Sequence, residues 1–551
     1  MSELSDMLEN SSEFPEKGNL YRPTNSTGRN TVTASSYKAN LNSHNDIAEK
    51  LRYENNDEEE NMDAFPEDKN QNNDLLNKTT IGDGFDDAVA GPYLVQKKEG
   101  EEEYNFNKRT ASLFERLLHP IQYGSLRGNI FGLSSMCLEA GALVLAIRCE
   151  QFGLINFLIA LALGGLLAYC TLNMMILAGK TTKETDYSKV VKSILGEKTG
   201  KYVDCNITIY LLGAVISFQV IIYQVIGAIY YDIKKIFNKD YTKQYENFEN
   251  FKEEYWRKEL KVKFPVMLGV AALVYPLCLI KDLSKMRIPS LIGVLALIYS
   301  IIVIIIESFF FLRKNNWELI SDMNWFDIRK AFSVDDGIPF FGGIATVFYI
   351  YSCHAGAFPV YKHLRENNDR RIKKVFRISI ILDIMVYVSV AAASFITCPK
   401  NPPELILYRE NLKGFDPDYF IILAKFGIVF NLFFSTPANY AGLRISLFQL
   451  IWGNSVITST KNLIVTFIIL LIVVVTGALY DEILEYIELL GGFCSVIYCF
   501  FIPMLIYVKS NKYPKTAMIN IVSFSVLLIC LIIGYTSGIL TILFNMVKIN
   551  G

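Results

Sequence analysis

Three carboxylates lie inside long apolar stretches of this chain, where a charge needs a partner or a proton. They are Glu139, Glu307 and Asp383. A carboxylate within a membrane span costs about 2.5 kcal/mol or more unless it is hydrated or paired. Each is therefore a candidate ion-coupling residue that carries a proton. Glu139 also fits contact with a cationic ligand or a buried ion pair, and the other two also fit a hydrogen bond to a neighbouring helix.

Other polar side chains in apolar stretches are candidates for ion handling. His354 titrates near neutral pH, which fits gating or proton sensing as well as structural anchoring. No second His, Cys or carboxylate stands at ligand spacing from it, so we expect no metal site. Ser435 and Thr436, with Asn439 one turn on, offer oxygens for a sodium ion, but such hydroxyls also bond back to the preceding helical turn.

Two apolar segments are interrupted by glycines, and each opens one half of the apolar region. They are residues 124–153 and residues 337–359. A break inside a membrane span frees backbone groups, which persist only where protein, water or a ligand binds them. A matched pair of breaks in two halves is typical of a transporter's substrate site. The alternative is that these glycines let helices pack closely.

The backbone at such breaks suits a zwitterion. Helix N-termini attract a carboxylate, and unwound carbonyls accept from an ammonium group. We also expect polar and aromatic groups of the span at 203–231 to line a pocket there, although aromatic side chains at helical spacing serve packing equally well. The candidate substrate-binding residues are Cys137, Glu139, Ala140, Gly141, Gln219, Tyr223, Phe348, Ser352 and Cys353.

The elements that must hold these residues are membrane helices. The chain has 551 residues and is 51% hydrophobic, but residues 1–105 are rich in Asn, Ser, Glu and Asp. Such a composition predicts a disordered acidic tail. Without an apolar leader after Met1 we expect the tail to stay cytosolic. Residues 106–126 fit a lead-in helix on the cytosolic surface. The net charge of -1 predicts no nucleic-acid partner.

Eleven stretches are long enough to span a bilayer, which needs about 20 apolar residues in a helix. Lys and Arg gather in alternate loops, and this bias predicts a cytosolic N-terminus and a C-terminus on the opposite side. The predicted spans are 127–148, 154–178, 203–231, 264–280, 288–312, 338–360, 375–397, 418–443, 462–480, 484–508 and 517–545.

Two sets of five spans have opposite membrane orientations because five is odd. This pattern predicts that the transmembrane domain, residues 127–545, is an inverted repeat. The first repeat is residues 127–312, the second is residues 338–508, and an extra helix follows at residues 517–545. The predicted fold class is an all-α integral membrane protein with eleven transmembrane helices.

The sixth span carries a specific motif. FYIYSCHAGAFPVYKHL, residues 348–364, resembles the Phe-x-Cys-His-x-x-x-x-Pro-x-Tyr-x-x-Leu pattern of the amino acid/auxin permease family. EAGALVLAI in span one resembles that family's Gly-x-Gly-x-Leu-x-Leu-Pro signature, with Glu139 in place of the first glycine and Ala146 in place of the proline. Gly491 and Pro503 match its tenth span, and FFSTPANYAGLR, residues 433–444, matches its eighth.

The resemblance covers about residues 120–545 and implies a function. It implies a leucine-transporter-like five-plus-five fold that moves an amino acid across the lipid bilayer with H⁺ or Na⁺ and needs no cofactor. A vacuolar or lysosomal membrane is favoured over the plasma membrane, because acidic compartments suit proton coupling. The alternative is an amino acid sensor whose tail binds a cytosolic partner. An enzyme is disfavoured, since HExxH, GxSxG and a phosphate-binding loop are all missing from the sequence.

Overall fold

The computed structural model describes most of the apolar region and none of the first 123 residues. The described residues are 124–138, 140–238, 245, 248–256, 260–280, 287–314, 334–365, 368–398, 402–412, 417–452, 458–510, 532, 534–536 and 539. The predicted tail, most of the lead-in helix and nearly all of the predicted extra helix lie outside these residues. All regular structure in the described part is helical.

Ten of the eleven predicted spans coincide with helices. The first five correspond to α6 (Leu126–Cys137), η2 (Ala140–Val144) and α7 (Leu145–Phe152) together, then α8 (Leu154–Thr182), α10 (Glu197–Phe237), α13 (Leu260–Cys278) and α14 (Arg287–Lys314). The next five correspond to α15 (Val334–Ile350), η7 (His354–Gly356) and α16 (Ala357–His363) together, then α17 (Asp369–Thr397), α18 (Tyr419–Trp452), α19 (Ser459–Leu479), and α20 (Ile483–Leu489) with η9 (Leu490–Phe501) and α21 (Ile502–Ser510).

By length and composition, 8 described helices can cross a membrane, or 9 when the bent pair at span one counts as one span. The halves of the sixth span, α15 with 17 residues and α16 with 7, are each too short alone. This chain is an all-α multi-pass membrane protein, and the count of eleven stays a prediction.

Local sequence sets where several helices begin. The Ser125 hydroxyl accepts from the amide of Gly128 and so caps α6, and the Asn368 side chain caps α17 in the same way. Gly153 and Gly196 have φ of 83° and 94°, a backbone conformation that glycine adopts without strain. They separate α7 from α8 and the short α9 (Tyr187–Leu195) from α10.

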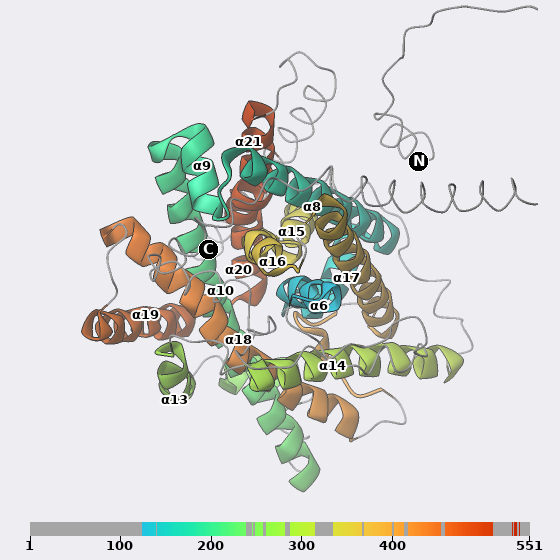
Figure 1. Ribbon diagram of the computed structural model, residues 1–551. Helices are drawn as coiled ribbons and strands as arrows, with labels where there is room; N and C mark the ends of the chain where they lie inside the picture. Colours follow the sequence, from blue (N-terminus) through green and yellow to red (C-terminus); the bar gives the residue numbers. More distant parts are fainter. Residues whose placement is uncertain are drawn as a thin grey trace, which may run out of the picture. The chain divides into compact units, whose positions relative to one another are not determined.

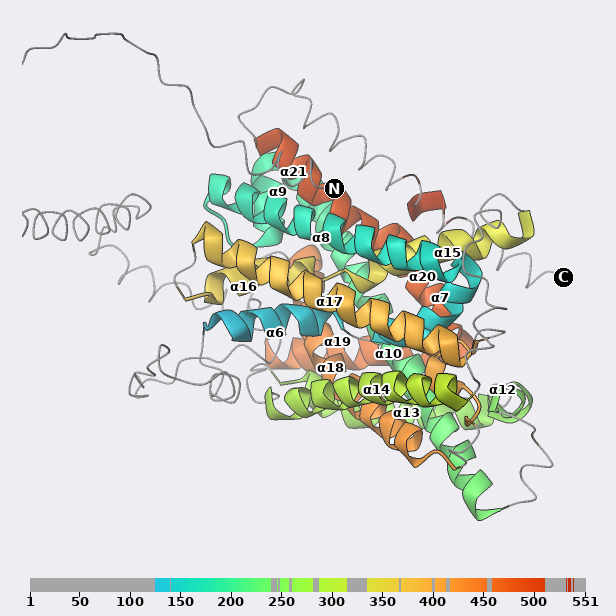
Figure 2. The same ribbon diagram turned by 90° about the vertical axis from the view of Figure 1, so that its right-hand side faces the viewer.

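The two broken spans lie in the middle of the helix bundle. Figure 1 shows α6, α15 and α16 together, with α8 and α17 on one side and α10 and α18 on the other. Figure 2 shows the helices lengthwise, with α9, α16 and the start of α6 at one end and α7, α20 and α12 (Phe248–Phe251) at the other. The breaks therefore lie inside the bundle, between its ends.

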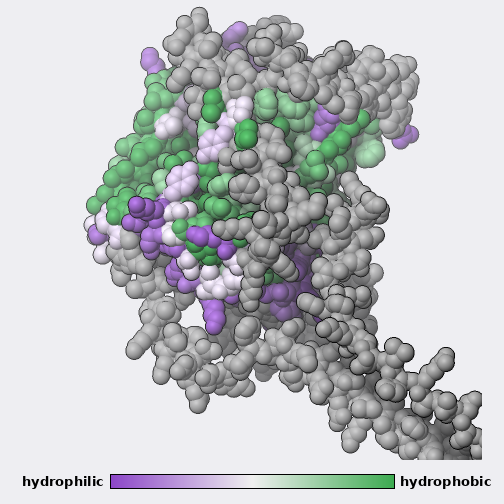
Figure 3. Space-filling model, turned by 90° about the horizontal axis from the view of Figure 1, so that it is seen from above, coloured by the Kyte–Doolittle hydropathy of each residue, from purple (hydrophilic) through white to green (hydrophobic). Residues whose placement is uncertain are grey.

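Apolar side chains cover the outside of these helices. Figure 3 shows hydrophobic residues on both the left and the right of the described surface, with hydrophilic residues among and below them. Large apolar side chains stand exposed on several spans, as expected of a surface that faces lipid rather than water. Examples are Leu163, Leu273, Phe309, Leu423 and Phe467.

Candidate functional site at the two helix breaks

The first break separates α6 from α7 inside the first span. The last turn of α6 is closed by the amide of Leu138, which donates to the carbonyl of Ser134 at 2.8 Å. The chain then continues as the 3₁₀ turn η2, and the two helical halves are bent by 49°. Glu139 and the side chain of Ala140 lie outside what the structure describes, so their assignment to the site stays a prediction.

The second break separates α15 from α16 inside the sixth span. The α-helix ends at Ile350, and the amide of Cys353 donates to the carbonyl of Tyr351 at 2.9 Å, a tight turn that leaves the helical path. The turn η7 follows, and α16 begins at Ala357. Both glycine-containing segments, residues 124–153 and 337–359, therefore contain a break in the helix.

The two breaks contact each other. A Cβ built on Gly141 would lie 2.6 Å from Cγ2 of Ile350 and 3.6 Å from Cδ1 of Tyr349. The buried thiols of Cys137 and Cys353 also meet. This contact fits the close packing that was the alternative to a substrate role for Gly141, and the substrate role stays a prediction.

A tyrosine of the seventh span joins the breaks. The hydroxyl of Tyr387 on α17 donates to the carbonyl of Cys137, the last residue of α6, and lies 3.1 Å from the carbonyl of Ile350, the last residue of α15. Both carbonyls have lost their helical donors at the breaks. The side chain of Tyr387 is fully buried, so it replaces the donors that water would supply elsewhere.

Asp383 lies one helical turn before Tyr387. Its side chain is 0% exposed, and neither carboxylate oxygen accepts a hydrogen bond of normal geometry from the described residues. The Ser134 hydroxyl and the Cys137 thiol face it from α6. The structure thus places this predicted ion-coupling residue at the first break.

A chain of hydroxyl groups lies on the other side of the second break. The Ser352 hydroxyl is 2.7 Å from that of Ser495 on η9 and also donates to its own helix at the carbonyl of Phe348. The hydroxyl of Tyr498 donates to the Ser352 carbonyl at 3.2 Å. The π-helical geometry of η9, which is frequent at functional sites, aims both side chains at the break.

His354 is held inside the protein by α8. Its side chain is 0% exposed, and Nε2 lies 2.8 Å from the hydroxyl of Thr171. That hydroxyl is also 3.0 Å from the carbonyl of Leu167 and 3.1 Å from that of Ala168, so its proton is engaged there. The histidine Nε2–H is then the donor. This geometry favours the anchoring role, and gating stays a prediction.

The polar groups of α10 are engaged elsewhere. The amide of Gln219 donates to the carbonyl of Met267 on α13 at 2.7 Å, and the hydroxyl of Tyr223 donates to the carbonyl of Trp256. Tyr210 of the same helix instead approaches the second break, with its ring centroid 6.2 Å from that of Tyr349. Sequence alone did not identify Tyr210, because an aromatic residue in a span looks the same on any helix face.

The candidate sodium ligands on α18 form bonds within their own helix. Thr436 donates to the carbonyl of Leu432 at 2.7 Å, and the side-chain amide of Asn439 donates to the carbonyl of Ser435 at 3.4 Å. For Thr436 this is the back-bonding that was the alternative to sodium binding, and a sodium-binding role of Ser435 stays a prediction. Within the described part of the chain no three His, Cys, Asp or Glu residues are placed to hold a metal ion.

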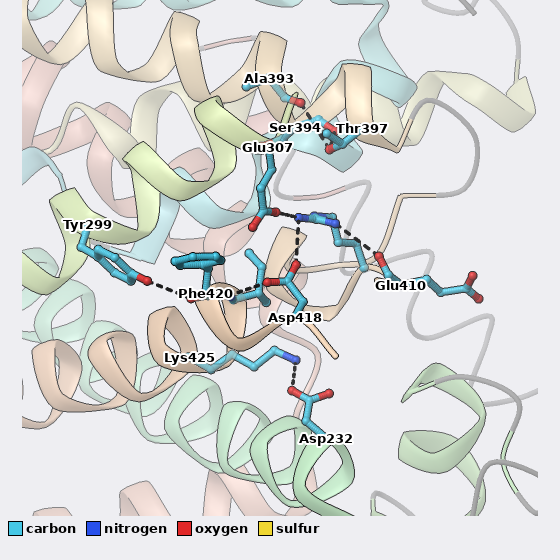
Figure 4. A network of polar contacts seen from close by, with 12 residues as sticks. Asp232, Tyr299, Glu307, Ala393, Ser394, Thr397, Glu410, Asp418, Phe420 and Lys425 are labelled. Atoms are coloured by element: carbon cyan, nitrogen blue, oxygen red, sulfur yellow. Dashed lines mark hydrogen bonds and ion pairs between the residues drawn. The ribbon is translucent and has the colours of Figure 1, made fainter. Parts of the chain in front are cut away.

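Glu307 is in an ion pair away from the breaks. Its carboxylate binds a guanidinium nitrogen of Arg409, and the same nitrogen lies 3.9 Å from Asp418 (Figure 4). Close by, Lys425 of α18 binds Asp232 of α10 at 2.5 Å. These buried pairs join α10, α14 and α18 to the segment before α18. They give Glu307 a structural partner that its position in the sequence does not reveal.

A further buried ion pair joins α7, in the first span, to α20, at the start of the tenth span. Arg148 of α7 lies 2.7 Å from Glu488 of α20 and also donates to Gln151 at 2.8 Å. The pair packs on Gly342 of α15, where a Cβ would lie 2.4 Å from a Glu488 oxygen. It links α7 to α20 at the end of the bundle where Figure 2 shows these two helices.

Comparison with protein families gives one extended match. The family described as Transmembrane amino acid transporter protein matches residues 124–547, more than half of the chain. The protein named amino acid transporter AAT1 from Toxoplasma gondii is 21% identical over 51% of this chain and 35% of its own length. Sodium-coupled neutral amino acid transporter 7 from Danio rerio is 22% identical over 52% of this chain and 58% of its own length. The chain thus matches less than two thirds of either relative.

Comparison with solved structures gives a weaker likeness. The crystal structure of an Eremococcus coleocola manganese transporter, in complex with an aromatic bis-isothiourea substituted compound, aligns with 75% of this chain and 86% of its own at 12% identity. Its TM-score is 0.41. At that score the likeness carries no argument about fold or function.

Proposed function

Because this chain belongs to the transmembrane amino acid transporter protein family, we propose that it carries an amino acid across a membrane as a secondary active transporter. The family match covers the whole described bundle. The observation that carries the proposal is the contact between the two broken spans, where Gly141 meets Ile350. Paired breaks of this kind give a zwitterion both dipole ends and unwound carbonyls inside the membrane.

The substrate site in this proposal is the backbone of the two breaks. The carbonyls of Cys137 and Ile350 share the single proton of Tyr387, so lone pairs remain for an ammonium group. The substrate carboxylate is bound by backbone amides near η2 and η7. Phe348 and Tyr210 then border the side-chain part of the site. Movement of the broken helices against the rest exposes this site to each side in turn.

Uptake into proteoliposomes tests this function. Purified full-length protein would be reconstituted, and labelled amino acids would be scanned under an imposed proton or sodium gradient. We expect accumulation of one class of amino acid above protein-free liposomes, driven by one of the two gradients. Absence of uptake for every amino acid under both gradients would contradict the proposal. A vacuolar or lysosomal-type membrane is the site we expect, to be checked by localisation of the tagged protein.

The alternative is an amino acid sensor that signals through the acidic residues 1–105. Deletion of this tail separates the two functions. A transporter keeps its flux without the tail, whereas a sensor loses a bound cytosolic partner. We favour transport because the family match begins at residue 124 and excludes the tail.

A further inference from the structure

Asp383 differs from every other buried acid in the described part of the chain. Each of the others is in an ion pair: Asp204 with Lys192, Glu307 and Asp418 with Arg409, Asp481 with Lys263, and Glu488 with Arg148. Asp383 is 0% exposed, forms no ion pair with a described residue, and accepts no hydrogen bond of normal geometry from one. No cation of the described residues therefore compensates its charge.

The groups that face Asp383 are neutral. Ser134 and Cys137 face it from α6, Tyr351 from the turn after α15, and Tyr387 from its own helix. The helices α7, α8 and α14 also pack on α17, and none of their described residues forms an ion pair with Asp383. A carboxylate that is faced by a hydroxyl, a thiol and two phenols but by no cation of the described residues is among the most costly groups to bury.

We propose that Asp383 is the group that binds the proton coupled to amino acid movement, an inference that rests on the function proposed above. A proton removes the charge and needs neither extra space nor further ligands. A sodium ion would need several oxygens converging on one point, and a thiol is a poor ligand for such a hard cation. The buried, unpartnered geometry therefore fits the protonated acid.

Cys137, the last residue of α6, connects the proton site on Asp383 to the break in the first span. Asp383 faces the side chain of Cys137, and Tyr387 binds the carbonyl of the same residue. When water reaches the site, the carboxylate is hydrated and charged, and it takes up H⁺ to become a neutral carboxylic acid. The neutral acid then packs against the end of α6, where the structure places the side chain of Asp383. When water enters from the other side, the acid releases its proton there.

The Asp383→Asn variant tests this role, because it keeps the shape and removes the titration. In proteoliposomes we expect exchange of labelled for unlabelled amino acid to persist, while accumulation driven by a pH gradient falls to an inside-to-outside ratio of unity. Asp369→Asn is the matched control. It makes the same change at the exposed start of the same helix, in a carboxylate 56% exposed and paired with Lys180, and it should keep gradient-driven accumulation.

Three results would overturn this role of Asp383 without contradicting the proposed transport function of the wild-type protein. One is wild-type accumulation driven by sodium and insensitive to pH. The second is full pH-driven accumulation by Asp383→Asn. The third is loss of exchange together with loss of amino acid binding in a folded Asp383→Asn protein, which would place Asp383 on the substrate ammonium. If that variant does not fold, Asp383→Glu keeps the proton site and should shift the pH dependence of uptake, and an unchanged pH profile would contradict the proposal.

Discussion

Tyr387 has one phenolic proton and two backbone carbonyls within reach. It donates to the end of α6 and lies 3.1 Å from the end of α15. Removal of the hydroxyl in Tyr387→Phe leaves both carbonyls buried without that donor. We expect the variant to lose about 1–3 kcal/mol of stability, the cost of an unsatisfied buried polar group. Thermal unfolding of the purified protein would measure this loss.

Tyr351 supplies a matched control for that experiment. Its ring packs edge-to-face on Tyr387 with centroids 5.5 Å apart, but its buried hydroxyl has no hydrogen-bond partner among the described residues. Tyr351→Phe likewise removes a phenolic hydroxyl, from a ring that contacts Tyr387. It should leave the unfolding temperature unchanged or raise it. Equal losses in the two variants would show that the hydroxyl of Tyr387 does not hold the breaks.

The contact between Gly141 and Ile350 can be tested by adding or removing a few side-chain atoms. In Gly141→Ala the new methyl lies 2.6 Å from Cγ2 of Ile350, so we expect transport to fall as the breaks are pushed apart. Ile350→Ala removes the opposing atoms, and the double variant should recover part of the activity. Uptake measured over this double-mutant cycle isolates the pairwise effect. Additive losses would instead place a substrate at Gly141.

At the scale of elements, η9 approaches α15 more closely than side chains allow. A Cβ on Gly491 would lie 2.0 Å from the backbone carbonyl oxygen of Ala345. A backbone atom cannot relieve this contact by a change of rotamer, as a side chain could. Gly491→Ala should therefore cost about 1–3 kcal/mol or more, as overpacking does, and should lower the unfolding temperature. Gly269→Ala on α13 meets nothing within 4 Å and should unfold as the wild type does. The prediction fails if both variants behave alike.

The link between α7 and α20 depends on the pair Arg148 and Glu488. Arg148→Met leaves Glu488 largely buried without its cation, and loss of one partner from a buried pair costs about 3–5 kcal/mol. We expect Arg148→Met to unfold at a lower temperature. Addition of Glu488→Gln should restore part of the loss, because the stranded charge is gone. No recovery in the double variant would mean that packing of the arginine, rather than its charge, joins the two elements.

The elements were more predictable from sequence than the contacts between them. Glycines at both breaks and long apolar runs predict the broken spans, and the structure confirms them. The roles of Tyr387, Tyr210 and Arg148 depend on residues far away in the chain, and a lone tyrosine or arginine near a span does not reveal its partner. Gln219 was predicted to line the site because it is a polar residue in an apolar span. The sequence does not show which side of the helix it occupies, and in the structure its side chain binds the carbonyl of Met267 instead.

At the scale of the whole molecule, most buried ion pairs of the described residues involve helices that lie at one end of the bundle. The pairs are Arg148–Glu488, Lys252–Glu404, Lys263–Asp481, Lys425–Asp232 and Arg409–Glu307. They include residues of α7 and α20 and the residue after α12, and Figure 2 shows these three helices at the same end. The predicted orientation, with a cytosolic N-terminus, makes this the extracellular or lumenal end. Removal of one partner from such a pair leaves a buried charge without compensation, so these pairs stabilise the packing of the helix ends on that side.

The central claim is that an amino acid crosses the membrane by way of the two facing breaks. Counterflow tests it most directly, because the exchange of labelled for unlabelled substrate needs no ion gradient and no knowledge of the coupled ion. Liposomes that contain the purified protein and are preloaded with each amino acid in turn should take up the labelled form of at least one of them. Gly491→Ala, which displaces α15, should reduce that uptake. Counterflow equal to that of protein-free liposomes for every amino acid would contradict the account.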